Sequence, residues 1–314
     1  MVNLVTKSRY LVCAYFFRLS FAWGLFGRKT SDRRFSGNNR SPLSTSPTAL
    51  QEALIQRSAQ VRLLVGEDPS LYKLENTLYI DSSFHAREGH RRGFCNWIVP
   101  GFVMIGHYPG QTPESGGPTH QEVRQHIQKI TQTHQVSLFC SLQTEIPSQN
   151  DSSSWWDHDN QGRIFLEPPS LRRQFPHPFT HYAPIVREYC QRDPIFLHHP
   201  IEDLNVPDSH EPLEQLLLEL LNHMSQKGKG AVYLHCWGGR GRGGLVGACL
   251  LSLLWPTLTS QEILDWIQRG YATRLGHDKM PLTLSKSPQT TAQRDFVHSF
   301  VQRNRGWQQT YSSL

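Results

Sequence analysis

The sequence predicts an α/β fold with a mainly parallel central sheet flanked by helices. Four apolar segments of strand length, within 97–110 and at 136–142, 195–201 and 231–235, are separated by helical stretches. Apolar strands that alternate with helices are typical of a parallel sheet covered on both faces. The last of these segments leads into a glycine-rich loop and then into an apolar helix, which is the third indication of such a fold.

Residues 1–50 form a basic leader that is rich in serine and arginine. They hold eight Lys or Arg and one acid, Asp32, so this segment carries a charge of +7 and the rest of the chain sums to −1. The composition predicts either an organelle transit peptide or a disordered basic tail. Because the remainder is nearly neutral, we expect no nucleic-acid partner. No apolar run reaches the about 20 residues of a membrane span, so no transmembrane segment is expected.

Residues 51–96 are expected to form an N-terminal extension. Helical spacing of apolar residues predicts a helix over 51–65, and 77–80 is interpreted as a short strand. The basic run 85–92 is predicted to be a solvated loop.

The main domain is predicted over 97–305, with a tail at 306–314. Besides the four strand segments we expect helices at 119–133, 212–221, 243–255, 259–273 and 289–303. Between 149 and 192 lies an insertion that is polar at first and then rich in aromatics and proline. It is too long for a plain connector. Either it flanks the functional site or it is a surface excursion, and we favour the second interpretation.

The residues that carry chemistry follow the strand 231–235. Five residues, three of them glycine, separate Cys236 from Arg242. Glycines allow successive backbone N–H groups to point into a loop and bind an anion, and the next helix adds its positive end. The guanidinium of Arg242 can bind two phosphate oxygens at once. The predicted phosphate-binding residues are His235, Trp237, Gly238, Gly239, Arg240, Gly241 and Gly243.

The same loop would activate the thiol of Cys236. A free cysteine is only a few per cent thiolate near neutral pH. Backbone donors, a helix N-terminus and a guanidinium all favour the anion. The loop therefore predicts a sulfur nucleophile beneath a bound phosphorus atom.

The pattern of His235, Cys236, Gly239 and Arg242 resembles the signature of the cysteine-dependent protein-tyrosine and dual-specificity phosphatases. The resemblance covers about residues 97–305. Within the family, the chain resembles plant and algal tyrosine-phosphatase-like proteins above all. It implies a dual-specificity-phosphatase-like fold and hydrolysis of phosphotyrosine through a cysteinyl-phosphate intermediate, with phosphoserine and phosphothreonine left open. It implies a phosphoprotein partner and neither a cofactor nor a metal.

Two further catalytic residues are implied by this resemblance. Asp203 lies in a Pro-Ile-x-Asp segment at the expected distance before the cysteine and would protonate the leaving group. Glu202 and Asp208 compete for this role, although Asp208 better suits a helix N-cap. Gln293, in a Pro-x-Thr-x-x-Gln motif, would orient the water that hydrolyses the phosphocysteine, or it is an exposed helix residue.

The sequence departs from the family at Gly243, where the family has Ser or Thr. Without that hydroxyl we expect slower hydrolysis of the phosphoenzyme, and an inactive phosphate-binding pseudophosphatase stays an alternative. Arg240 resembles a base that phosphoinositide phosphatases carry in this loop, so a phosphoinositide or inositol-phosphate substrate is a second alternative. A sulfur- or arsenate-transfer enzyme is disfavoured by the loop spacing. Trp237 either stacks on a substrate ring or packs against a helix.

The six cysteines are scattered and contain no Cys-x-x-Cys pair, so neither a disulfide framework nor a zinc site is expected. Reduced thiols fit an intracellular, reducing compartment. The leader narrows this expectation to the cytoplasm, a plastid or a mitochondrion. The sequence leaves the oligomeric state open.

Overall fold

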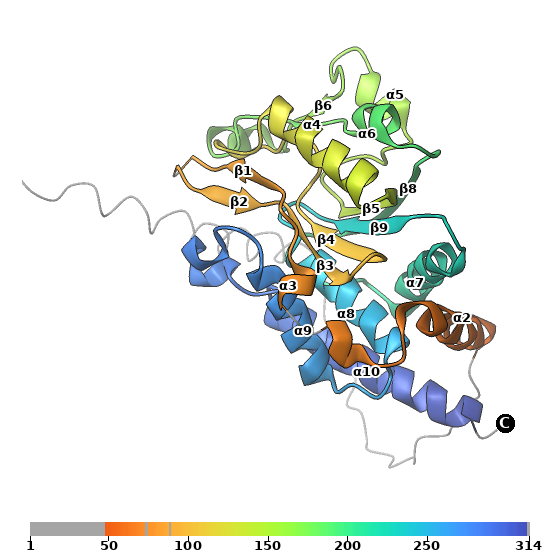
Figure 1. The fold of residues 1–314 in the computed structure, drawn as a ribbon. Helices are drawn as coiled ribbons and strands as arrows, with labels where there is room; N and C mark the ends of the chain where they lie inside the picture. The colour runs from red at the N-terminus through yellow and green to blue at the C-terminus, as the bar shows by residue number, and fades with distance from the viewer. Residues whose placement is uncertain (1–47, 73–74, 88, 313–314) are drawn as a thin grey trace, which may run out of the picture. The chain divides into compact units, whose positions relative to one another are not determined.

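The computed structural model describes residues 48–72, 75–87 and 89–312, within one compact unit. The predicted leader 1–50 lies almost entirely outside the described residues. The central sheet has the strand order β3-β4-β9-β5-β8 (Figure 1). In that order the strands are Cys95–Val99, Val103–Gly106, Ala231–His235, Val136–Gln143 and Ile195–Ile201. Only the β3–β4 pair of this sheet is antiparallel, so the mainly parallel α/β prediction is confirmed.

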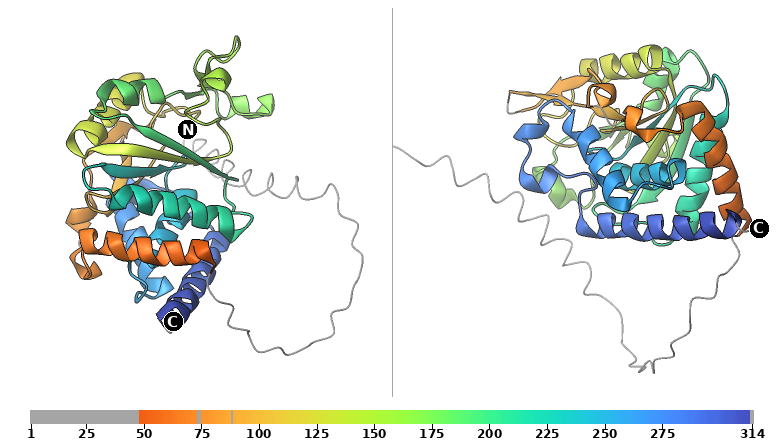
Figure 2. Two further views of the ribbon diagram at one scale, coloured as in Figure 1. Left: turned by 90° about the vertical axis from the view of Figure 1, so that its right-hand side faces the viewer. Right: turned by 60° about the horizontal axis from the view of Figure 1, so that its bottom comes forward.

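Helices cover both faces of the sheet (Figures 1 and 2). One face carries α4 (His120–Gln128) and α6 (Ala183–Tyr189). The other side carries α2 (Ala49–Val65), α7 (His210–Ser225), α8 (Arg242–Leu254), α9 (Ser260–Ala272) and α10 (Thr291–Ser312). Four of the five strands are buried along their whole length, which explains why apolar residues predominate on both of their faces instead of alternating with polar ones. Within the described residues, no helix combines the length and the apolar character that a bilayer crossing requires.

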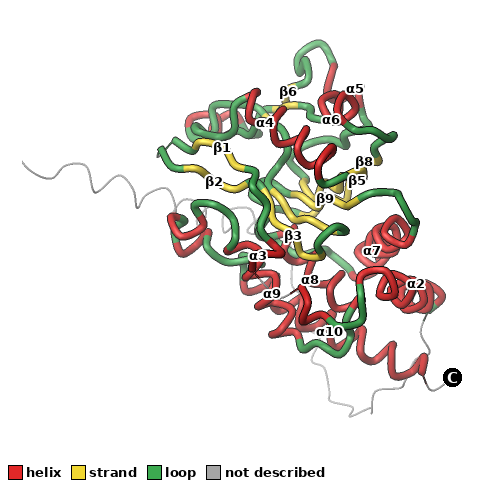
Figure 3. The backbone as a smooth tube through the Cα atoms, in the orientation of Figure 1, coloured by secondary structure: helices red, strands yellow, loops and turns green. Residues whose placement is uncertain are grey.

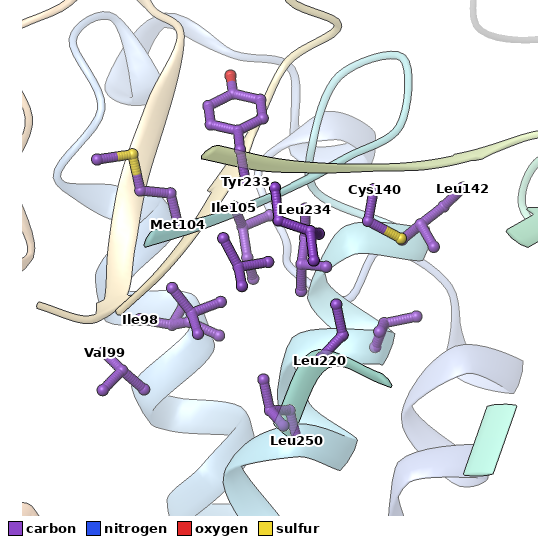
Figure 4. Close-up of a cluster of buried hydrophobic side chains, with 14 of the residues drawn as sticks. Ile98, Val99, Met104, Ile105, Cys140, Leu142, Leu220, Tyr233, Leu234 and Leu250 are labelled. Atoms are coloured by element: carbon purple, nitrogen blue, oxygen red, sulfur yellow. The ribbon is translucent and has the colours of Figure 1, made fainter. Parts of the chain in front are cut away.

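The core between the sheet and α8 fixes where that helix begins (Figure 4). Ile105 of β4 and Leu234 of β9 meet Leu250 of α8 and Leu220 of α7 there, and all four are buried. Gly247 of α8 lets the helix approach closely, because a Cβ at this position would lie 2.6 Å from Cδ1 of Ile105. The N-terminus of α8 is thereby held at the end of β9.

Three predicted elements differ from the structure. Residues 77–80 are not a strand, since a short helix, α3 (Glu75–Leu78), occupies this part of the chain. The predicted loop 85–92 differs at its two ends, where β1 (Ser83–His85) pairs with β2 (Arg91–Gly93), and its basic side chains hid these short strands. The predicted tail is mostly helical, because α10 extends to Ser312 and buries Trp307 against Phe300.

The insertion 149–192 is not a surface excursion. Between β5 and β8 it forms α5 (Ser152–Trp156), β6 (Arg163–Ile164), a 3-10 turn (Pro169–Arg173), β7 (Phe179–Thr180) and α6, joined by loops (Figure 3). Trp155, Phe179 and Tyr182 are fully buried. β7 lies along the loop after β4, where the N–H of Gln111 donates to Oγ1 of Thr180 at 2.9 Å. The aromatic residues of the insertion pack beside the site, which the composition alone did not reveal.

Candidate active site

The predicted phosphate loop, residues 236–241, lies at the centre of the sheet's C-terminal edge. β9 ends at His235, which is in register with Gly106 of β4 and Ser141 of β5, and α8 begins at Arg242. Cys236 is 3 % exposed and Arg242 is 1 % exposed. Ligands of α/β sheets bind at this edge of the strands.

The loop backbone is held open from outside by Arg274. This buried side chain donates from Nη1 to the carbonyl of Gly238 at 3.1 Å and from Nη2 to that of Gly239 at 2.8 Å. In a trans peptide the next N–H points opposite to the carbonyl, so these peptide units direct their N–H groups away from Arg274. Gly239 has φ +63°, and a Cβ there would lie 2.0 Å from the carbonyl oxygen of Gly106. Only glycine fits this turn.

Arg242 is paired with two acids and keeps one donor unused. Its Nη1 and Nη2 bind the two carboxylate oxygens of Glu145 at 2.7 and 2.9 Å, and Nη2 lies 3.1 Å from Oδ1 of Asp203. Burial opposes the positive charge, but the bonds to Glu145 outweigh it and raise the pKa of Arg242. Among the described residues, Nε of Arg242 is buried and has no hydrogen-bond partner. An oxyanion in the loop would supply that acceptor.

Asp203 follows β8 on a loop whose conformation is constrained. Burial raises the pKa of Asp203, Arg242 acts against this and Glu145 reinforces it, and the net shift is upward. More of this carboxyl is therefore protonated than in a free aspartate, as proton donation requires. Leu204 next to it has φ +63°, an unusual conformation for a side chain with a Cβ.

The two competing acids take other places. The carboxylate of Glu202 accepts from Nδ2 of Asn205 at 3.1 Å, within its own loop. Asp208 is not the N-cap of α7 as the sequence suggested, because Ser209 occupies that position.

Gln293 is fully buried, so it is not an exposed helix residue. Its Oε1 accepts from the N–H groups of Gln289 and Thr290 at 3.1 Å, and its Nε2 donates to the carbonyl of Asn205 at 3.0 Å. A Cβ on Gly241 would lie 3.2 Å from both amide atoms. Gln293 thus joins the loop of Asp203 to the phosphate loop, and its role in orienting water stays a prediction.

His235 is tied to the insertion. Its Nε2 is 2.7 Å from the hydroxyl oxygen of Tyr182, the residue that precedes α6. Burial lowers the pKa of His235 to about 3, so its imidazole is neutral at physiological pH. A neutral ring adds no charge behind the loop.

Trp237 packs on the insertion rather than on a helix. Its ring centroid is 5.0 Å from that of Phe175 and 5.3 Å from that of Phe179, both in edge-to-face geometry. Its Nε1 donates to Glu114 at 2.8 Å, and Glu114 also lies 3.4 Å from Nε2 of His107. Trp237 is therefore fixed at the edge of the loop.

Arg240 lies within the loop, and Gly243 is the second residue of α8. The half-buried Arg240 donates from Nε to Oε1 of Gln289 at 3.1 Å, and its guanidinium lies beside Gly238. A Cβ on Gly243 would lie 2.8 Å from Cγ2 of Ile105. The methyl group of Ile105 thus occupies the space that a serine or threonine at position 243 would need.

Sequence reasoning missed four residues of the site, namely Glu114, Glu145, Tyr182 and Arg274. Glu145 had a usable signal, since it follows a buried strand at the edge where the cysteine was expected. Arg274 had none, because an arginine just after a helix suits the negative helix end equally well. Within the described residues, no group of three His, Cys, Asp or Glu side chains is arranged to hold a metal ion.

A buried thiol at a strand end, a glycine-rich loop and an arginine at the following helix N-terminus form the arrangement expected of a cysteine-dependent phosphatase. Residues 179–297 match a family model described as PTP-SAK, Swiss Army Knife protein, DSP-PTPase phosphatase domain. The match spans Asp203, Cys236, Arg242 and Gln293. Residues 179–297 are therefore similar to a phosphatase domain of the DSP-PTPase class.

Known proteins resemble parts of this chain. Cyclin-dependent kinase inhibitor 3 of Sus scrofa is 33 % identical over 115 residues, which cover 36 % of this chain and 46 % of the relative. The protein of the same name from Rattus norvegicus is 30 % identical over 131 residues, 40 % of this chain and 52 % of its own length. The chain thus spans about half the length of the curated relatives it matches.

One solved structure with a similar arrangement is the kinase associated phosphatase (KAP) with serine in place of its catalytic-site cysteine. It has 18 % sequence identity and a TM-score of 0.43, and the match covers 68 % of this chain and 96 % of that chain. The predicted similarity to plant and algal proteins stays a prediction.

The contacts of Arg274 predict that Arg274→Lys weakens anion binding. A lysine keeps the charge but lacks the planar guanidinium, whose three nitrogens reach Asn96 and the carbonyls of Ile105, Gly238 and Gly239 at once. The affinity for orthovanadate should therefore fall about 10- to 100-fold by calorimetry. The matched control is Arg305→Lys, since Arg305 also binds backbone carbonyls, those of Pro256, Thr257 and Leu258. Equal losses in both variants would show that Arg274 has no special relation to the loop.

Proposed function

We propose that this protein hydrolyses phosphate monoesters, phosphotyrosine above all, through a cysteinyl-phosphate intermediate. The observation that carries the proposal is the unused Nε–H of the buried Arg242, in the loop that begins at Cys236. A buried cationic donor without an acceptor is costly unless a ligand completes it. A phosphate in the loop would supply that acceptor and lie over the thiol.

In the first step the sulfur of Cys236 attacks phosphorus, and the bond from phosphorus to the ester oxygen breaks. Asp203 gives its proton to that oxygen, which leaves as an alcohol or phenol. Arg242 and the loop N–H groups stabilise the charge on the other three oxygens. Both carboxylate oxygens of Glu145 bind the guanidinium of Arg242, and these two hydrogen bonds fix its orientation.

In the second step water attacks phosphorus and the sulfur–phosphorus bond breaks. Asp203, now a carboxylate, accepts the proton from water, and inorganic phosphate leaves. The thiolate is restored, and no redox partner is needed. Since the reaction depends on a reduced thiol, we also propose a reducing intracellular compartment for the protein. The described cysteines fit this, as Cys95, Cys140, Cys190, Cys236 and Cys249 are all free.

A second candidate substrate is a phosphoinositide or an inositol phosphate. Arg240 in the phosphate loop favours such a substrate. Its half-buried guanidinium, bonded to Gln289, adds a cation beside the reacting phosphate. Purified full-length protein should therefore be assayed with phosphotyrosine peptides, phosphoinositides and soluble inositol phosphates, beside Cys236→Ser. Binding of any of these by the serine variant, with no turnover by the wild type, would identify a pseudophosphatase.

Replacement of the proposed acid should depend on the leaving group. Asp203→Asn should lower kcat by about two to four decades for a phosphotyrosine peptide, but less for p-nitrophenyl phosphate, whose leaving group needs little protonation. Wild-type activity should fall as the pH rises through the pKa of Asp203, which lies above its ordinary value, and the variant should lose this limb. Asp208→Asn is the matched control on the same loop. Equal losses for both leaving groups would contradict the assignment.

The contact between positions 243 and 105 predicts how turnover can be accelerated. Gly243→Ser alone should destabilise the fold by about 1–3 kcal/mol, because the added Cβ meets Cγ2 of Ile105. Adding Ile105→Leu removes that methyl branch, so the double variant should regain stability and hydrolyse the phosphoenzyme faster. Quench-flow should show a burst above the steady-state rate in the wild type and a smaller burst in the double variant, with Ile105→Leu as control. Equal burst and steady-state rates in the wild type would show that release is not slow.

A further inference from the structure

A closed ring of hydrogen bonds lies at the end of β4, on the face of the sheet that carries α4. Its members are five buried residues, which we call the hydrogen-bond ring: Ser82, Phe94, His107, His126 and Tyr233. One half of the ring is formed by side chains. Oγ of Ser82 lies 2.6 Å from Nδ1 of His126, and Nε2 of His126 lies 3.0 Å from the hydroxyl oxygen of Tyr233. That hydroxyl donates to the carbonyl of His107 at 2.9 Å.

The other half of the ring is formed by the backbone. The N–H of His107 donates to the carbonyl of Phe94 at 2.7 Å, and the N–H of Phe94 donates to the carbonyl of Ser82 at 2.8 Å. The ring of Phe94 also stacks on that of His126, with the centroids 4.0 Å apart and the planes at 7°. The imidazole of His126 is thus held by packing as well as by its two hydrogen bonds.

The donor and the acceptor of each side-chain bond can be assigned. The hydroxyl of Tyr233 gives its only proton to His107, so it accepts from the Nε2–H of His126. Burial lowers the pKa of His126 well below its ordinary value, so the imidazole is neutral and its Nδ1 carries no proton. The hydroxyl of Ser82 therefore donates to Nδ1. Loss of any one of these groups leaves its neighbours with buried polar atoms that have no partner.

Tyr233 reaches the ring from β9, three residues before Cys236. Figure 4 shows its side chain on the opposite face of the strand from Leu234. A Cβ at Gly106 would lie 1.9 Å from the hydroxyl oxygen of Tyr233. The glycine at 106 is therefore what lets this hydroxyl pass across β4 to the carbonyl of His107.

Both neighbours of His107 contact the phosphate loop. On one side, the carbonyl of Gly106 lies so close to Gly239 that any Cβ there would meet it at 2.0 Å. On the other side, the N–H of Tyr108 donates to the carbonyl of Trp237 at 2.9 Å. The place of residue 107 thus determines where two residues of the phosphate loop can lie.

We infer that Ser82, His126 and Tyr233 are positioning residues, which hold the carbonyl of His107 and thereby keep the phosphate loop in its anion-binding conformation. They are buried and act through the backbone of 106–108. Of the five members of the ring, only Tyr233 lies within residues 179–297, which match the phosphatase family model. The segment before β1 that supplies Ser82 would thus serve the active site. The inference rests on the proposed function, because the loop must hold a phosphate over Cys236.

The test is a double-mutant cycle, read as orthovanadate affinity and as kcat/KM for p-nitrophenyl phosphate. Tyr233→Phe and Ser82→Ala each remove one hydroxyl and little bulk, and each should lower both quantities about three- to tenfold. Either change opens the same ring, so the double variant should lose about as much as one single variant. The matched control is Tyr72→Phe, since the hydroxyl of Tyr72 also donates to a backbone carbonyl, that of Val65 at the end of α2. It should change neither quantity.

Losses that multiply in the double variant, or no loss in either single variant, would overturn the inference. If the wild type binds vanadate but hydrolyses no ester, the proposed function fails, and the ring is judged on vanadate affinity alone. If the wild type does not bind vanadate either, hydrogen exchange decides. Tyr233→Phe should then speed exchange of the amides in residues 236–241, whereas Tyr72→Phe should not. Unchanged exchange in Tyr233→Phe would overturn the role of the ring.

Discussion

The buried charge of Arg242 is the constraint on which this end of the protein depends. A guanidinium that is 1 % exposed would be very costly without partners, and breaking such a pair typically costs about 3–5 kcal/mol. Glu145 from the loop after β5 and Asp203 from the loop after β8 supply the compensating charges. The side chain of Arg242 thereby fixes the ends of β5 and β8 relative to the start of α8. Its Nε–H stays available to a ligand.

The rest of the site is arranged around that cation. Arg274 binds the phosphate loop from the side opposite to the ligand, and Gln293 joins the loop of Asp203 to it. The side chain of Asp203 is 42 % exposed, against 1 % for that of Arg242, so the acid is the more accessible of the two partners. An accessible position suits a group that must approach a substrate, give up a proton and take one back. Cys236, in contrast, directly follows β9, and Arg242 is the first residue of α8.

Features that depend on a local sequence pattern could be predicted, whereas contacts between residues far apart in the chain could not. The strands could be predicted because burial makes most of their residues apolar. The phosphate loop could be predicted because its chemistry lies within seven consecutive residues. Asp203 was predicted from its Pro-Ile-x-Asp segment and its distance before Cys236, and the structure places its Oδ1 3.1 Å from Nη2 of Arg242. Arg274 and Glu145 act on residues 35 and 97 positions away, which no local pattern reveals. The sequence showed that Gly243 departs from the family pattern. The reason for a glycine there is steric, because Cγ2 of Ile105 occupies the space of a side chain, and this contact exists only in the folded state. The insertion was misjudged because aromatic and proline-rich composition does not say which surface it covers.

The most direct test of the account is the alkylation of Cys236 by iodoacetate at mildly acid pH, followed by mass spectrometry and repeated with orthovanadate. A sulfur nucleophile at the floor of an anion-binding loop should react with iodoacetate faster than free cysteine does. Iodoacetate should also outpace the neutral iodoacetamide, relative to their rates with free cysteine, and vanadate should protect Cys236. Reaction at the rate of free cysteine with both reagents, and no protection, would contradict the central claim.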